Sequence, residues 1–207
     1  MIDRVTRLVP FSGVVFALLS LAGMATAQPP PGVKATGEQV LAFSKLHAGS
    51  QRTADGLLIA GFAFFLFFVG SLRAHLRRSP EAAAASAVAL AGAAVLAGGV
   101  ALYIGMDAAS NAAPFALAPA AAQALNVLAL QLVYPVLVGG FVFGIAAGAA
   151  ILRSRRLPAW LGWAAIVIGL IPLWIVQFLL LYVWAVVTSI LLYKRRDTSE
   201  PGQLQTG

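Results

Sequence analysis

The stretch that decides the fold is RSRRLPAWLGWAAIVIGLIPLWIVQFLLLYVWAVVTSILLYKRR, residues 153–196. Basic clusters stand at both of its ends, and no charged residue lies between them. Because Arg and Lys beside membrane spans favour the cytoplasmic side, both ends should share one side, with an even number of crossings between them. Pro172 lies near the middle, where it removes a backbone donor and clashes with the preceding turn. The stretch therefore predicts two spans, Pro158–Leu173 and Trp174–Tyr193, joined by a tight turn at 171–173.

The same alternation of apolar runs and basic clusters covers the rest of the chain. A helix needs roughly 20 apolar residues to cross the hydrocarbon core of a bilayer, and in lipid only helices and closed barrels satisfy the backbone. Four further runs meet that length, and none contains a charged residue: Leu8–Ala27, Gly56–Leu72, Ala83–Ile104 and Ala124–Leu152. The predicted fold is all-α, a polytopic transmembrane bundle of six spans.

The first run has a second interpretation. A basic start, an apolar run and the small residues Ala25 and Ala27 also describe a cleavable signal peptide. Cleavage after Ala27 would leave five spans and an outer N-terminus, whereas retention gives six spans with both ends inside. We expect retention, because the run is longer than the roughly 7–15 apolar residues of a signal peptide.

Composition and charge place the protein in a membrane. Hydrophobic residues make up 60% of the 207 and charged residues 10%, against roughly a quarter charged in soluble domains. The net charge of +7 comes from the junctions assigned to the cytoplasm, because the three outer cations (Lys34, Lys45, Arg52) are matched by three acids (Glu38, Asp55, Asp107). This asymmetry predicts a bacterial plasma-membrane protein with both termini in the cytoplasm, lipid as its surroundings and no nucleic-acid partner.

Residues 28–55 are predicted to form an extracytoplasmic segment. Pro29–Gly32 cannot continue a helix and should be extended. Thr36 followed by Gln39 matches a capping box, which predicts a short amphipathic helix that closes at Gly49. An ordinary ordered loop is the alternative. Residues 56–196 should then form a five-helix bundle after the first segment, and 197–207 a disordered cytoplasmic tail.

Small residues at four-residue spacing predict helix packing, because they fall on one face and let two backbones approach. The third span has such a series in Ala85, Ala89, Ala93, Ala97, Ala101 and Gly105, and the fourth has Gly140, Gly144 and Gly148. We expect these two helices to pack together. An oligomer interface is the competing use of the same faces.

Uncharged polar groups in or near the spans are the candidates for a ligand site. The predicted set is Asn126, Gln131, Tyr134, Gln177, Tyr103 and Asp107, which lie at compatible depths and could line one outward-facing cavity. Interhelical hydrogen bonding is the competing role. Pro135 also leaves the carbonyl of Gln131 without its usual donor, which predicts a kink or a bound water.

Several chemistries lack the residues they need. The chain has no Cys and only two His, His47 and His75, on opposite sides of the predicted membrane, so paired haem ligands and thiolate sites are not expected. Zinc-protease, Walker and dinucleotide motifs are absent from the sequence. We therefore predict no catalytic residue, no metal site and no cofactor.

Three segments carry a resemblance to a family. RSRRLPAWLGWAAIVIG with a last span ending in LLYKRR, the outer segment EQVLAFSKLHAGSQRTADGLLIAG and the basic exit LRAHLRR are similar to segments of uncharacterised actinobacterial six-helix integral membrane proteins, a DUF4386-like domain of unknown function. The resemblance covers most of the chain through topological motifs. It implies a six-helix fold with a retained first helix, and no catalytic residues.

Three functions follow as hypotheses. The first is a non-enzymatic membrane protein that acts through helix contacts with a membrane partner or a second copy. The second is a carrier or binding protein for a small apolar or lipidic molecule, which needs a continuous cavity near Gln131, Tyr134 and Gln177. The third is a membrane enzyme, which would require Asp107 to approach Tyr103 and Asn126 inside a cleft.

Overall fold

The computed structural model describes residues 11–112 and 116–197, and these residues form helices without a strand among them. The helices are α2 (Ser12–Thr26), α3 (Gly37–Leu76), α4 (Pro80–Ala112), α5 (Pro119–Gln131), α6 (Val133–Ser154), α7 (Ala159–Leu170) and α8 (Trp174–Asp197). The predicted all-helical class is thus confirmed. The start of the first predicted span and the predicted disordered tail after 197 lie outside the described residues.

Four stretches are long and apolar enough to cross a membrane: α3, α4 to residue 111, α5 with α6, and Ile175–Lys194 of α8. The other two helices are shorter, with 15 residues in α2 and 12 in α7. At a rise of 1.5 Å per residue they measure about 22 and 18 Å, less than the ~30 Å of a hydrocarbon core. Four of the six predicted spans therefore have spanning length in the structure.

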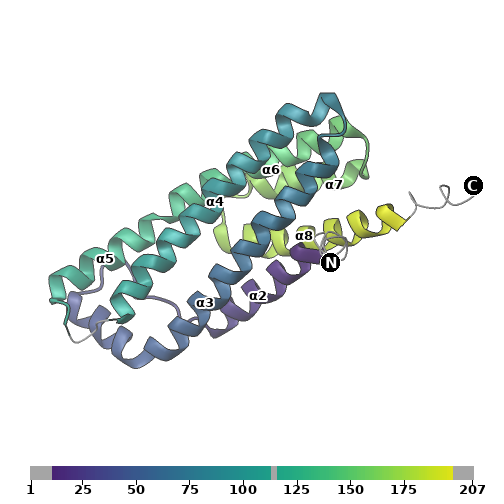
Figure 1. Cartoon of the computed structure of the whole chain (residues 1–207). Helices are drawn as coiled ribbons and strands as arrows, with labels where there is room; N and C mark the ends of the chain where they lie inside the picture. The colour runs from purple at the N-terminus through teal and green to yellow at the C-terminus, as the bar shows by residue number, and fades with distance from the viewer. Residues whose placement is uncertain (1–10, 113–115, 198–207) are drawn as a thin grey trace, which may run out of the picture.

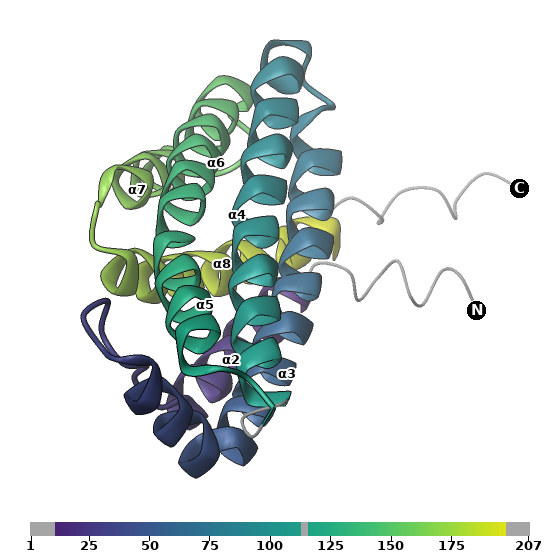
Figure 2. The ribbon, with the colours of Figure 1, turned by 90° about the vertical axis from the view of Figure 1, so that its left-hand side faces the viewer.

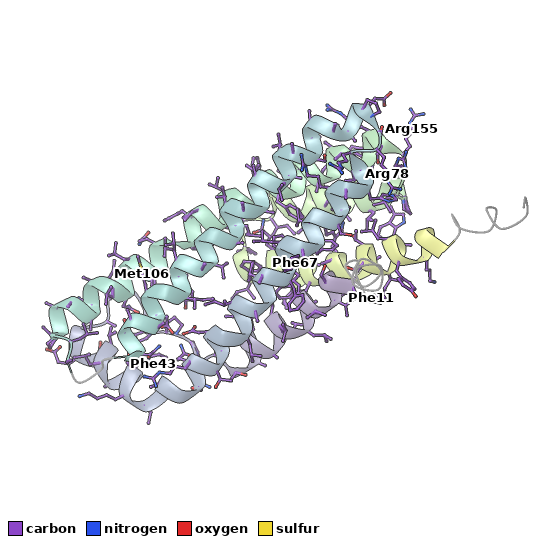
Figure 3. All side chains as sticks on the ribbon, in the orientation of Figure 1. Phe11, Phe43, Phe67, Arg78, Met106 and Arg155 are labelled. Carbon is purple, nitrogen blue, oxygen red and sulfur yellow. The ribbon has the colours of Figure 1, made fainter. Side chains whose placement is uncertain are left out.

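Helices α3, α4 and α6 lie side by side along one axis, and α8 crosses them at a steep angle (Figures 1 and 2). Helix α4 lies between α3 and α6, α2 runs along α3, α7 packs on α6, and α8 contacts α2 and α7 (Figures 1 and 2). Arg78 and Arg155 mark one end of the bundle (Figure 3), which we call the arginine end. Helix α5 and the first part of α3 lie at the opposite end, where α3 bends across the bundle (Figure 1).

Helix α3 begins as the sequence predicts and ends much later. The Thr36 hydroxyl accepts from the backbone N–H of Gln39, whose side chain accepts in turn from the Thr36 N–H, so the capping box is confirmed. The predicted end at Gly49 is wrong, because the helix continues to Leu76. A single glycine costs only about 1 kcal/mol inside a helix. The predicted separate short helix is therefore the first part of one 40-residue helix.

Both predicted proline effects are confirmed. The helix breaks at Leu132, between α5 and α6, three residues before Pro135. Helix α7 ends at Leu170 and α8 begins at Trp174, so the chain turns at 171–173 around Pro172. Proline disrupts the helical ladder in each case, because it has no N–H and its ring crowds the turn before it.

An aromatic cluster joins the helices in the interior. Phe65 of α3 is fully buried and contacts Phe16 of α2 and Phe143 of α6, with ring centroids 4.9 and 5.3 Å apart. Phe143 in turn meets Trp184 of α8 at 5.9 Å, edge to face. Buried aromatic side chains contribute both large apolar area and favourable edge-to-face contacts. This cluster ties four helices into one core.

Glycine lets the backbones approach at three helix contacts. A Cβ added to Gly139 of α6 would collide with the backbone nitrogen of Leu96 on α4. Gly144 and Gly148, expected to face α4, lie instead against Gly169 and Gly162 of α7. The α4–α6 contact therefore forms, but its glycines are Gly92, Gly99 and Gly139. The predicted alanines Ala89, Ala93 and Ala97 are buried, and Gly140 faces Gln177.

Candidate functional site

Two carboxyl groups meet at the end of the bundle opposite the arginine end. Asp55 lies on α3 and Asp107 on α4, and their carboxyl groups lie against each other. Asp55 is buried, with 8% of its surface exposed, and Asp107 is half-buried. Two ionised carboxylates in contact repel each other. The pair therefore needs a positive charge, either a shared proton or a cation, to hold this geometry.

Asn111 and Arg52 form a second polar layer one helical turn away. The Asn111 Nδ2 donates to Asp107 Oδ2 at 2.8 Å. The Arg52 guanidinium donates to the backbone carbonyl of Asn111 at 2.9 Å, which links α3 to α4 near the end of α4. A guanidinium on a free carbonyl in the last turn of a helix also interacts favourably with the helix dipole. This hydrogen bond holds α3 and α4 together close to the carboxyl pair.

A small cavity adjoins Asp107, whereas Asp55, Asn111 and Arg52 do not line it. Its volume is about 20 Å³, room for about one water molecule. Pro31 of the loop before α3, Ser44 of α3, Tyr103 and Asp107 of α4 and Asn126 of α5 contribute to its wall. The Asn126 Nδ2 donates to the Pro31 carbonyl at 3.1 Å, which ties the proline loop to α5. The loop and the first part of α3 thus close the cavity at this end.

The structure brings together three of the six predicted ligand residues. Tyr103, Asp107 and Asn126 share the wall of this cavity. Gln131 and Tyr134 do not join them, because both are exposed on the bundle surface, Tyr134 to 64%. The cavity that was predicted to include all six is thus absent from the described part of the chain.

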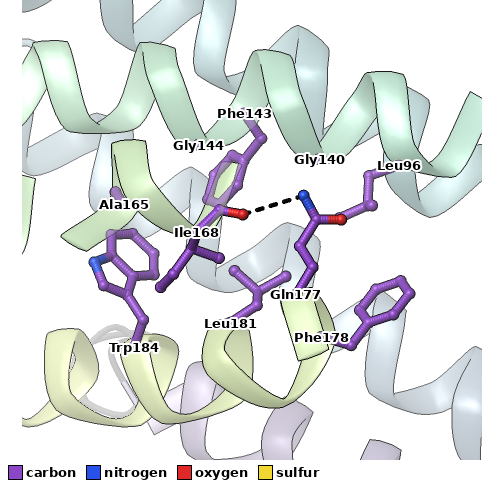
Figure 4. Close-up of a pocket in the computed structure, with 10 residues that line it drawn as sticks. All are labelled: Leu96, Gly140, Phe143, Gly144, Ala165, Ile168, Gln177, Phe178, Leu181 and Trp184. Atoms are coloured by element: carbon purple, nitrogen blue, oxygen red, sulfur yellow. Dashed lines mark hydrogen bonds between the residues drawn. The ribbon is translucent and has the colours of Figure 1, made fainter. Parts of the chain in front are cut away.

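Gln177 lies in a different place, under the α7–α8 turn. Its Nε2 donates to the carbonyls of Ile168 and Gly169 at 3.3 and 3.4 Å, where α7 ends (Figure 4). The Ile168 carbonyl also accepts from the backbone N–H of Ile171 at 3.3 Å, so Gln177 adds a side-chain donor to the C-terminal end of α7. The adjoining cavity, lined by Gly140 and Trp184 among others, holds about 10 Å³ (Figure 4). That volume is too small for a lipidic ligand.

Sequence reasoning missed Asp55, Asn111 and Arg52 as members of a site. A signal for the aspartates was present. Asp55 stands one residue before the second predicted span and Asp107 three residues after the third, and antiparallel neighbours place these two positions at the same depth. The sequence gives less reason to assign Asn111 and Arg52 to a site, because polar residues near a helix end commonly face water.

A second candidate is the surface of α4 that turns away from the bundle. It consists of small residues that are all exposed and repeat at alternating steps of three and four, and we call it the α4 small face: Ala84, Ala87, Ala91, Ala94, Gly98, Ala101 and Gly105. No atom lies within 4 Å of a Cβ added at Gly98 or Gly105. Large apolar residues (Val88, Val95, Leu102) flank it at seven-residue intervals, also exposed.

Comparison with protein families, with curated proteins and with solved structures finds no match for this chain. The resemblance to DUF4386-like proteins therefore stays a prediction. The evidence on function is the geometry of the two candidate sites.

Proposed function

We propose that the protein is a multi-pass component of the bacterial plasma membrane with both termini in the cytoplasm. Four helices have spanning length, and the basic residues of two junctions gather at one end, marked by Arg78 and Arg155 (Figure 3). Phe11 and Tyr193, near the two ends of the chain, have ring centroids 4.7 Å apart. This supports a six-segment path that begins and ends on one side, with α7 reaching only part of the way across and turning back through α8.

Cysteine labelling tests this path, because the chain has no cysteine of its own. Lys34→Cys lies before α3, on an exposed residue, and Ser79→Cys lies between α3 and α4 at the arginine end. A membrane-impermeant maleimide on intact cells should label Lys34→Cys, and Ser79→Cys only after the membrane is opened. The reverse pattern would contradict the orientation.

We further propose that the protein is non-enzymatic and acts through helix contacts within the membrane. The observation that carries this proposal is the α4 small face. At the helix contacts inside the bundle, small residues let backbones approach, as at Gly139 and Gly144. Other parts of the exposed surface include large side chains, such as Phe67 at 62% and Val183 at 63%. A stripe of Ala and Gly facing outward is typical of a surface that receives another helix.

The partner we propose first is a second copy of the same chain. The alternating steps of three and four are the spacing of helices that wind around each other with a left-handed supercoil. Val88, Val95 and Leu102 form a ridge beside the small face. The ridge of one copy can fit into the groove that the small face forms on α4 of an identical copy. A self-complementary surface of this kind builds a two-fold dimer.

A pair of glycine variants tests the contact. Gly98 belongs to the small face and Gly70 lies on α3, and neither has an atom within 4 Å of an added Cβ. Gly→Leu raises helix propensity equally at both. We expect Gly98→Leu to weaken self-association in liposomes at least about tenfold, the equivalent of 1.4 kcal/mol, as measured by energy transfer between labelled copies on dilution with lipid.

Gly70→Leu should associate like the parent. Equal association of the two variants and the parent would contradict a contact through α4. A parent that shows no self-association, while Gly98→Leu alone loses the physiological activity of the chain in cells, would assign the face to a different membrane protein.

The binding-protein and enzyme hypotheses rest on one observation, the cavity shared by Tyr103, Asp107 and Asn126. At about 20 Å³ it accommodates about one water molecule. A lipidic ligand would require the proline loop and the first part of α3 to move away. Soaking the protein in nanodiscs with spin-labelled lipid and finding probe contact at Tyr103 would favour that hypothesis over helix contacts.

A further inference from the structure

The polar group at Asp55 and Asp107 contains more acceptors than donors. The Asp55 Oδ2 is buried, and no hydrogen-bond donor meets it. The Asn111 Oδ1 is likewise buried and without a donor, on a side chain with 1% exposure, while its own Nδ2 reaches Asp107. Both statements refer to the described residues. A buried acceptor without a partner costs free energy, so one such acceptor within the carboxyl pair and a second on the amide that contacts Asp107 require an explanation.

A shared proton explains only part of this arrangement. One proton between the two carboxyl groups removes their repulsion and satisfies a single acceptor. It leaves the Asn111 Oδ1 without a partner, because Arg52 is directed to the backbone carbonyl of Asn111 instead. A hard cation can be met by several oxygens at once and carries the charge that the two carboxylates lack.

We propose that Asp55, Asp107 and Asn111 bind a hard divalent cation of the Ca²⁺ class at the end of the bundle opposite the arginine end. Carboxylate and amide oxygens are the ligands that Ca²⁺ takes in proteins. The two carboxylates come from neighbouring helices and balance its charge. The cavity next to Asp107 holds about 20 Å³, which provides room for a water ligand.

The position of the site fits exchange with the aqueous phase. Asp107 and Tyr103 are half-buried, and the site lies at the last turns of α4, beyond the apolar part of that helix. A bound cation would pull α3 and α4 together at the same layer where Arg52 already joins them. We predicted no metal site from the sequence, because the chain has only seven acidic residues and no metal-binding motif.

Thermal unfolding of the full chain in nanodiscs tests the proposal. Measurements at constant ionic strength compare Ca²⁺, Mg²⁺ and Na⁺ with choline, and radioactive Ca²⁺ gives the stoichiometry. We expect Ca²⁺ at about 100 times its Kd to raise Tm by about 5 °C, with about one ion bound per chain. Asp55→Asn and Asp107→Asn should each abolish the shift and raise Tm in choline, because each removes the repulsion between the carboxylates.

Glu81→Gln is the matched control, since it removes an exposed carboxyl at the other end of α4. It should keep the full Ca²⁺ shift. The proposal is overturned if Ca²⁺ leaves the Tm of the parent unchanged, because the carboxyl pair would then share a proton only. Equal Ca²⁺ shifts in all variants would show surface binding to lipid, and a response to Na⁺ alone would overturn the divalent assignment. Self-association through α4 should not change in Asp55→Asn, so the two proposals fail separately.

Discussion

A single methyl group at Gly139 tests how closely α4 and α6 pack. A Cβ at this position would collide with the backbone nitrogen and Cα of Leu96, and it would lie 3.0 Å from the carbonyl oxygen of Gly92. All three are backbone atoms, so no side-chain rotation can relieve the contact. The two helices would have to separate, and overpacking of this kind costs about 1–3 kcal/mol.

Gly70→Ala provides the reference for Gly139→Ala. Both substitutions gain about 1 kcal/mol from helix propensity, but Gly70 has no atom within 4 Å of the added Cβ. The propensity terms cancel in the comparison. Gly139→Ala should therefore be less stable than Gly70→Ala by about 1–3 kcal/mol.

The assay is reversible unfolding in mixed micelles, followed by circular dichroism as the fraction of denaturing detergent rises. Gly70→Ala should unfold at the same or a higher detergent fraction than the parent, and Gly139→Ala at a lower one. A difference below about 0.5 kcal/mol between the two variants, no more than an ordinary surface substitution produces, would refute the packing described for α4 and α6.

Four further substitutions, at three positions, test single contacts. Gln177→Leu should lower the free energy of unfolding by about 1 kcal/mol, because the end of α7 loses its side-chain donor. Gln177→Glu should lower it by more, because a carboxylate would face two carbonyls. Detergent unfolding measures both variants. Thr36→Ala should cost about 1 kcal/mol through loss of the capping box and speed hydrogen exchange in the first turn of α3, with exchange in α6 unchanged. Trp184→Phe keeps the aromatic packing but loses the indole donor to the Leu161 carbonyl at 3.0 Å, so we expect a loss of about 1 kcal/mol; stability equal to the parent would show that this hydrogen bond contributes nothing.

The fold class and the main breaks could be predicted because each depends on local chemistry. Long uncharged apolar runs dictate helices in lipid, and Pro135 and Pro172 dictate where helices break. The length of α7 could not be predicted in this way. The apolar run of 158–173 is nearly long enough to cross, but its helix begins after Pro158 and ends before Pro172, which leaves 12 residues.

Helix partners and the site required knowledge of which faces meet. Gly144 and Gly148 are correctly recognised as contact residues, but spacing alone does not say whether α4 or α7 receives them. Alanines of the third span occur on every face of the helix. Of the series predicted to pack on the fourth span, Ala89, Ala93 and Ala97 are buried, whereas Ala101 and Gly105 are exposed on the α4 small face. Tyr103, Asp107 and Asn126 meet because they share a depth, whereas Gln131 and Tyr134 share that region and face outward.

Disulfide crosslinking along α4 tests the central claim, the contact between two copies through the small face, most directly. Single cysteines are placed at successive positions from 87 to 102 in the cysteine-free chain, and oxidation in native membranes is followed by the yield of covalent dimer. We expect maxima at Ala87, Ala91, Ala94, Gly98 and Ala101, with minima at the buried Ala89, Ala93 and Ala97 between them, and little dimer from Gly70→Cys on α3. Equal yields along α4, or a higher yield from α3 than from α4, would contradict the account.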